Sequence, residues 1–190
     1  MKILLASKSP RRRQLLSELG YPVEFVDIDI DEHVGTPLPS GEVAEHLACR
    51  KAAAYPKEKL DGETVLVTAD TVVVLEEHIL GKPADRAEAI CMLQRLAGRR
   101  HTVYTGVCLL TQKEKISFTE RTEVYFRPLS DQEIEYYVDH YRPMDKAGAY
   151  GIQEWIGMVG VERIEGCYYN VMGLPVARLY RTLRELLGSR

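Results

Sequence analysis

The hydrophobic pattern of the chain alternates between two periods, and each period predicts a different kind of element. Apolar and β-branched runs predict strands at residues 3–6, 23–30, 64–75, 101–111 and 116–126. Apolar residues at helical spacing predict helices at residues 10–20, 41–55, 85–96, 130–141 and 174–187. Strands and helices therefore alternate, and this order favours an α/β fold with a mixed sheet.

Shorter segments predict the connections. Residues 76–78 predict a turn, residues 79–80 the start of a returning strand, and residues 112–114 the turn of a hairpin. Residues 148–166 predict a loop with a short strand. Ser130 and Glu133 have the spacing of a capping box, which predicts that a helix starts there.

The segment LLASKSPRRR, residues 4–13, predicts an anion site. Ser7 and Ser9 suit a helix N-cap, and Pro10 suits the first helical position. Three arginines then fall in the first turn, where the helix dipole disfavours cations, so a bound phosphate would offset that cost. A solvent-exposed helix face is the alternative interpretation.

Length and composition indicate an ordinary globular protein. The chain has 190 residues, 45% of them hydrophobic and 28% charged, which predicts a single domain, residues 1–190, with two lobes. The net charge of −3 gives no reason to expect nucleic-acid binding, so a polyphosphate site would be a local basic cleft.

Cysteines and the N-terminus point to an intracellular protein. The four cysteines lack a CxxC pair or zinc spacing, so we expect reduced, mostly buried thiols in a cytoplasmic protein. Only four consecutive apolar residues precede Ser7, too few for a signal peptide or a membrane span.

Asp70 interrupts an otherwise apolar, β-branched strand, VLVTADTVVVL. An ionised carboxylate inside such a strand is costly unless it is paired or binds a metal. A carboxylate satisfied by backbone N–H groups at a bulge is the alternative.

Lys51 continues the apolar stripe of Ala44, Leu47 and Ala48 on the predicted helix. Its cation therefore points from the face that packs inward, either into a cleft or along its stem to water. Lys82, in the rigid turn Gly-Lys-Pro, presents another cation, although such turns are also common on surfaces.

Several cations together with the carboxylates Asp70 and Glu32 suit a polyphosphate bound with a divalent metal. The chain has no GxxxxGK[ST], GxGxxG, HExxH or GxSxG motif, and its histidines lack ligand spacing. Any phosphate chemistry must therefore use another type of site.

An ordered set of motifs resembles the Maf family of nucleoside triphosphate pyrophosphatases. The matching segments are LLASKSPRRRQLL (4–16), DIDE (29–32), RKAAA (50–54), TADTVV (68–73), GKP (81–83), AGRRHTVYTGV (97–107), DKAGAYGIQ (145–153) and YYNVMGLP (168–175). They cover nearly the whole chain in order, which makes the resemblance specific.

The resemblance implies an elongated, mixed sheet flanked by helices, with two lobes and a deep central cleft (Maf/ITPase-like). It also implies hydrolysis of a nucleoside triphosphate to the monophosphate and pyrophosphate. Arg12, Thr71 and Gln153 together resemble the branch that acts on dTTP and UTP, whereas a sister branch is similar to 7-methyl-GTP pyrophosphatases. The amide of Gln153 offers a donor and an acceptor to a pyrimidine edge, or it braces its own loop.

The motifs and the resemblance together suggest a mechanism. Ser7, Arg11, Arg12 and the helix N-terminus would hold the phosphates. Lys51 and Lys82 would neutralise charge on the scissile phosphoryl group and on pyrophosphate. Glu32 and Asp70 would hold Mg²⁺ or Mn²⁺, and Asp70 would act as the general base on water that attacks the α-phosphorus. Arg13 is expected to lie outside the substrate contacts.

Two other functions remain open. A nucleotide-binding regulator of cell division or septum formation would bind nucleotides with little turnover, but such a protein needs no general base. The same chemistry on modified or non-standard nucleotides would clean the nucleotide pool. A homodimer is the expected assembly, again from the resemblance alone.

Overall fold

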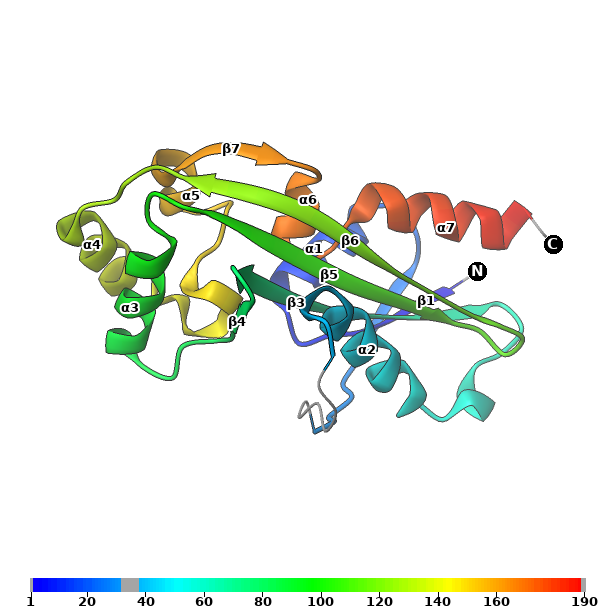
Figure 1. Cartoon of the computed structure of the whole chain (residues 1–190). Helices are drawn as coiled ribbons and strands as arrows, with labels where there is room; N and C mark the ends of the chain where they lie inside the picture. Colours follow the sequence, from blue (N-terminus) through cyan, green and yellow to red (C-terminus); the bar gives the residue numbers. More distant parts are fainter. Residues whose placement is uncertain (1, 32–37, 189–190) are drawn as a thin grey trace. The chain divides into compact units, whose positions relative to one another are not determined.

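A computed structural model describes residues 2–31 and 38–188 of the chain (Figure 1). Within these residues, seven strands form one sheet in the order β2-β1-β3-β5-β6-β7, with β4 paired to β3. The strands are β1 (Lys2–Ala6), β2 (Val23–Val26), β3 (Thr64–Leu75), β4 (His78–Leu80), β5 (Arg100–Leu110), β6 (Lys115–Phe126) and β7 (Val161–Glu165). β1 runs parallel to β2 and β3, whereas β4 and β7 run antiparallel to their neighbours, so the predicted mixed α/β sheet is confirmed.

Seven α-helices and three short 3₁₀ helices accompany the described strands. The α-helices are α1 (Pro10–Ser17), α2 (Ser40–Ala53), α3 (Arg86–Leu96), α4 (Asp131–Tyr141), α5 (Trp155–Gly160), α6 (Tyr168–Met172) and α7 (Val176–Gly188). The 3₁₀ helices are η1 (Lys57–Lys59), η2 (Pro143–Asp145) and η3 (Ala147–Ala149). None of the helices in the described part of the chain is long and apolar enough to span a bilayer.

The chain divides into two compact units. Unit 1 comprises residues 1–70, 105–120 and 173–190, and unit 2 comprises residues 71–104 and 121–172. Strands β3, β5 and β6 contribute residues to both units.

Unit 1 packs α2 against its strands around a small apolar core that includes Leu4, Leu66 and Leu110. Unit 2 has a larger core, in which α3 packs on α4 (Figure 1). His101 lies in this second core, where its ring meets Phe126 and Tyr150 edge-on and its Nε2 lies 2.7 Å from the Tyr150 hydroxyl. Burial without a charged partner lowers the pKa of His101 to about 3.

Several predicted boundaries are confirmed. β3 covers the predicted residues 64–75. Ser130 caps α4 with the predicted capping box, in which the Glu133 carboxylate accepts a hydrogen bond from the Ser130 N–H at 2.8 Å. β2, predicted over residues 23–30, ends at Val26 because its partner β1 ends opposite it at Ala6. The predicted loop at 148–166 contains helix α5, and helix α6 was not predicted.

The expectation of mostly buried thiols is wrong in part. All four cysteines are free, but only Cys108 is buried and Cys91 is exposed. A hydrogen bond with the Cys108 thiol lowers the pKa of Cys49 to about 6, and the same bond together with burial raises the pKa of Cys108.

Candidate functional site

The loop between β1 and α1 in unit 1 forms the predicted strand–loop–helix arrangement. Ser9 is the N-cap of α1, and its hydroxyl accepts a hydrogen bond from the Arg12 N–H at 3.4 Å. The buried hydroxyl of Ser7 accepts from the Ser9 N–H at 3.2 Å, which folds the loop over the start of the helix. The serine side chains and the start of α1 thus form the strand–loop–helix arrangement on which the anion-site prediction is based.

Two of the three arginines on α1 are used to fix backbone next to this loop. Arg12 donates from Nε to the Gly173 carbonyl at 2.7 Å and from Nη1 to the Ala69 carbonyl at 3.0 Å. Arg13 donates from Nε to the Ser7 carbonyl at 2.7 Å and pairs with Asp27. It therefore helps to fix the loop between β1 and α1, residues 7–9, which we call the serine loop. Arg11 is half-buried on the same helix.

The register of the sheet explains why Arg12 reaches β3. β1 ends at Ala6, which lies opposite Thr68, so β3 continues past its parallel partner. Ala69 is the first residue beyond the stretch of β3 that pairs with β1, and its carbonyl accepts a hydrogen bond from the guanidinium of Arg12. Asp70 follows directly, so the contacts of Arg12 from α1 and of Lys51 from α2 fall on neighbouring residues of β3.

Asp70 and Lys51 form an ion pair in unit 1. The Lys51 ammonium lies 2.6 Å from Oδ1 of Asp70, and each side chain is only 14% exposed. The prediction that Asp70 is a paired carboxylate is confirmed. The Lys51 ammonium points towards β3 and does not extend to the solvent.

One face of α2 sets this ion pair in place. Ala48 lies one turn before Lys51, and Thr68 lies two residues before Asp70 on the same face of β3. The buried Thr68 hydroxyl donates to the Ala48 carbonyl at 2.7 Å. Two contacts therefore join the same faces of α2 and β3: the hydrogen bond from Thr68 to Ala48 and the ion pair of Lys51 with Asp70.

Gly106 on β5 fixes the other end of α2. A Cβ at this position would lie 2.2–2.3 Å from backbone atoms of Ala44 and Glu45, so only glycine lets the helix approach this closely. The Glu45 carboxylate then accepts hydrogen bonds from Ser117 and Thr119 of β6, both at 2.7 Å. These contacts orient the helix that carries Lys51.

The donor set of the described residues is compatible with a hydrated divalent cation. No group of three His, Cys, Asp or Glu side chains gathers for a metal within residues 2–31 and 38–188. Mg²⁺, however, is commonly held by one or two carboxylates together with substrate phosphates, and Asp70 supplies one such carboxylate. The predicted second ligand, Glu32, lies outside the described residues.

The remaining predicted residues belong to unit 2. Thr71 follows Asp70 in β3, and Lys82 is exposed in the turn after β4. The Gly81 carbonyl of this turn accepts from the Gly148 N–H at 3.0 Å, so the turn is tied to the loop that leads to Gln153.

Three residues next to Gln153 were not singled out from the sequence. Lys146 is 8% exposed and pairs with Glu154 at 3.1 Å, and the hydroxyl of buried Tyr137 donates to the same carboxylate. Burial, followed by the neighbouring Glu154, raises the pKa of Tyr137. The DKAGAYGIQ motif contains Lys146, but nothing local in the sequence links it to Tyr137.

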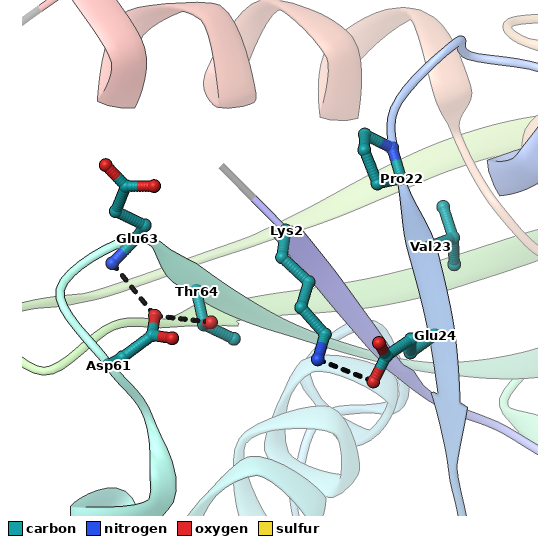
Figure 2. A pocket seen from close by; sticks show the side chains of 7 residues that line it. All are labelled: Lys2, Pro22, Val23, Glu24, Asp61, Glu63 and Thr64. Carbon is teal, nitrogen blue, oxygen red and sulfur yellow. Dashed lines mark hydrogen bonds and ion pairs between the residues drawn. The ribbon is translucent and has the colours of Figure 1, made fainter.

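A separate pocket lies at the opposite ends of the unit 1 strands. It has a volume of about 480 Å³ and is lined by Lys2, Pro22, Val23, Glu24, Asp61, Glu63 and Thr64. Figure 2 shows that Lys2 pairs with Glu24 and that the Asp61 carboxylate accepts from the backbone N–H of Glu63 and from the Thr64 hydroxyl, whereas the Glu63 carboxylate points away from these groups. It lies at the starts of β1 and β3, away from Ser7 and Asp70, and contains none of the predicted site residues.

Comparison with known proteins supports the family resemblance. Residues 2–186 match the family described as Maf, Maf-like protein. The dTTP/UTP pyrophosphatase of Bacteroides thetaiotaomicron is 50% identical over 187 residues, which cover 97% of this chain and 96% of that protein. The dTTP/UTP pyrophosphatase of Christiangramia forsetii is 42% identical and covers 99% of this chain and 95% of that protein.

A solved structure shows the same fold at lower similarity. The Staphylococcus aureus Ham1 protein aligns with a TM-score of 0.50 and 17% identity, over 66% of this chain and 72% of that one. This likeness concerns the fold alone.

Proposed function

Because the chain belongs to the Maf family, we infer that it is a nucleoside triphosphate pyrophosphatase that hydrolyses dTTP and UTP to the monophosphate and pyrophosphate. The observation that carries the chemistry is the ion pair of Lys51 and Asp70 beside the serine loop and Arg12. The substrate assignment is supported by relatives of that name at about half identity over almost the whole chain.

In the proposed reaction, a water oxygen bonds to the α-phosphorus and the bond from that phosphorus to the bridging oxygen breaks. Pyrophosphate leaves with the bond electrons, and the Asp70 carboxylate accepts a proton from the attacking water. Lys51 and Lys82 neutralise charge on the phosphoryl oxygens and on the leaving pyrophosphate.

Substrate binding is assigned to the loop and helix of unit 1. Ser7, Arg11 and the first turn of α1 hold phosphate oxygens, since the positive end of the helix dipole favours an anion there. Arg12 keeps its backbone contacts and presents the rest of its guanidinium charge to the nucleotide. Thr71 and Gln153 contact the nucleoside.

We propose Mg²⁺ or Mn²⁺ as the cofactor, held by Asp70 and Glu32 together with substrate phosphates. A bound divalent cation would supply positive charge to the phosphate oxygens and lower the pKa of a coordinated water. We also propose that the protein is a cytoplasmic homodimer. Both units belong to one domain in this proposal, because three strands contribute residues to both units.

The test is a product assay with the purified full chain, Mg²⁺ or Mn²⁺, and dTTP, UTP, CTP, 7-methyl-GTP and modified pyrimidine triphosphates. Pyrophosphate and monophosphate in equal amounts, chiefly from dTTP and UTP, are expected. Release of orthophosphate would contradict the reaction, and preference for 7-methyl-GTP or modified nucleotides would contradict the substrate. Nucleotide binding without turnover would favour the regulator of cell division instead.

A further inference from the structure

The segment from Gly151 to Glu154 is a tight turn that one tyrosine holds at both ends. Tyr137, fully buried on α4, accepts a hydrogen bond from the Gly151 N–H at 3.0 Å and donates to the Glu154 carboxylate. The turn itself is closed by the Glu154 N–H, which donates to the Gly151 carbonyl at 3.0 Å. Gln153 therefore lies between two anchored residues.

Lys146 completes the anchoring of Glu154. Its ammonium lies 3.1 Å from Oε1 of Glu154, while the Tyr137 hydroxyl binds Oε2. The two carboxylate oxygens thus have different partners, which fixes the plane and the position of the carboxylate. Such a group is an oriented negative charge beside the turn.

The amide of Gln153 lies close to this charge. A Cβ on Gly151 would be 2.9 Å from Nε2 of Gln153 and 2.9 Å from Cδ of Glu154, so both groups border the same glycine. A carboxylate attracts an amide NH₂ group and repels an amide oxygen. Oε1 of Gln153 is buried and meets no hydrogen-bond donor among the described residues.

The orientation of this amide decides which pyrimidine it can bind. Uracil and thymine present a donor at N3 and an acceptor at O4, whereas cytosine presents an acceptor at N3 and a donor at N4. A glutamine amide offers one acceptor and one donor, and a half-turn about its last bond exchanges them. A glutamine that is free to turn therefore binds both kinds of base.

We propose that Tyr137, Lys146 and Glu154 are positioning residues that fix the Gln153 amide with Nε2 towards Glu154, so that the site accepts uracil or thymine and rejects cytosine. This inference rests on the proposed function, because it assigns the base contact to Gln153. Nε2, the end of the amide that is not buried, then donates to O4 of uracil or thymine, whereas cytosine presents its N4 amino group, a second donor, at the same place.

The experiment compares the ratio of kcat/KM for UTP to that for CTP in the full chain and its variants. Tyr137→Phe and Glu154→Gln are each expected to lower this ratio about tenfold, mainly through better use of CTP. The matched control is Tyr150→Phe, which removes another buried tyrosine hydroxyl, the one beside His101, and is expected to leave the ratio unchanged.

A double-variant comparison separates positioning from a general loss of structure. If Tyr137 acts through Gln153, Tyr137→Phe has no further effect on the UTP/CTP ratio in a Gln153→Ala background. Unchanged ratios in Tyr137→Phe and Glu154→Gln, with a lowered ratio in Gln153→Ala, would overturn the inference and leave the proposed function standing. If the wild-type chain releases no pyrophosphate, the proposed function fails, and the ratio of UTP to CTP dissociation constants tests the positioning of Gln153 in the same variants.

Discussion

Replacing Asp70 by asparagine removes the charge of the central ion pair and keeps its shape. At an effective dielectric constant of about 20, charges 2.6 Å apart attract by about 6 kcal/mol. Most of this attraction is offset by the removal of water from both groups, which are only 14% exposed. Since an amide oxygen still accepts a hydrogen bond from Lys51, we expect Asp70→Asn to lower the free energy of unfolding by about 2 kcal/mol.

The effect on activity should be far larger than the effect on stability. Loss of a general base lowers turnover by about 10²–10⁴-fold. Urea unfolding followed by tryptophan fluorescence measures the first effect, and pyrophosphate release from UTP measures the second. The variant is expected to remain folded in the absence of urea while its hydrolysis of UTP falls to near background.

Two results would refute this reasoning. Full activity of Asp70→Asn would exclude Asp70 from the chemical step. In a cycle with Lys51→Met, the double variant should be less destabilised than the sum of the single variants, because each single change leaves the other group without its partner. Additive losses would show that the pair contributes no coupling to stability.

Other changes test further parts of the structure. Gly106→Ala should lower the free energy of unfolding by about 3 kcal/mol and reduce pyrophosphate release, because α2 must shift. Gly62→Ala, where a Cβ meets no atom within 4 Å, is the control, and equal urea midpoints for the two variants would contradict the packing argument. His101 has a folded pKa of about 3 against about 6.5 when unfolded, so the unfolded state binds the extra proton and stability falls as pH drops between these values. The destabilisation by His101→Gln should therefore shrink by about 1.4 kcal/mol per pH unit below 6.5 in urea titrations, whereas a constant difference would refute it. Arg12→Lys cannot reach both backbone carbonyls and should lower kcat/KM for UTP about tenfold; wild-type kinetics would contradict its assigned position.

The sequence predicts those parts of the fold that local patterns determine. The strand at residues 64–75 is continuous and β-branched, and the cap at Ser130 has a fixed local spacing, so both are predicted correctly. The end of β2 depends on where β1 ends, which no pattern within residues 23–30 records. Helix α5, WIGMVG, is short and contains two glycines, so its sequence lacks helical periodicity.

The candidate site is predictable to the same extent. Asp70 and Lys51 each conflict with their local pattern, and this conflict predicts that they are paired or functional before their contact is known. Tyr137 and Glu154 fit their surroundings as a core aromatic residue and a helix-start acid, so only the folded chain shows that they meet. The sequence likewise shows Gly106 only as a glycine within a predicted strand, and its close contact with α2 is visible only in the folded chain.

The way the chain is divided between its two units has a consequence for synthesis. Unit 2 is complete once residue 172 has left the ribosome, whereas unit 1 still lacks the segment that contains α7. The carbonyl of Gly173, which binds Arg12, also belongs to that last segment. A growing chain can therefore finish the unit that carries Gln153 first. The unit that carries Lys51 and Asp70 still needs the segment that begins at Gly173, so chains that stop before this segment lack part of that unit.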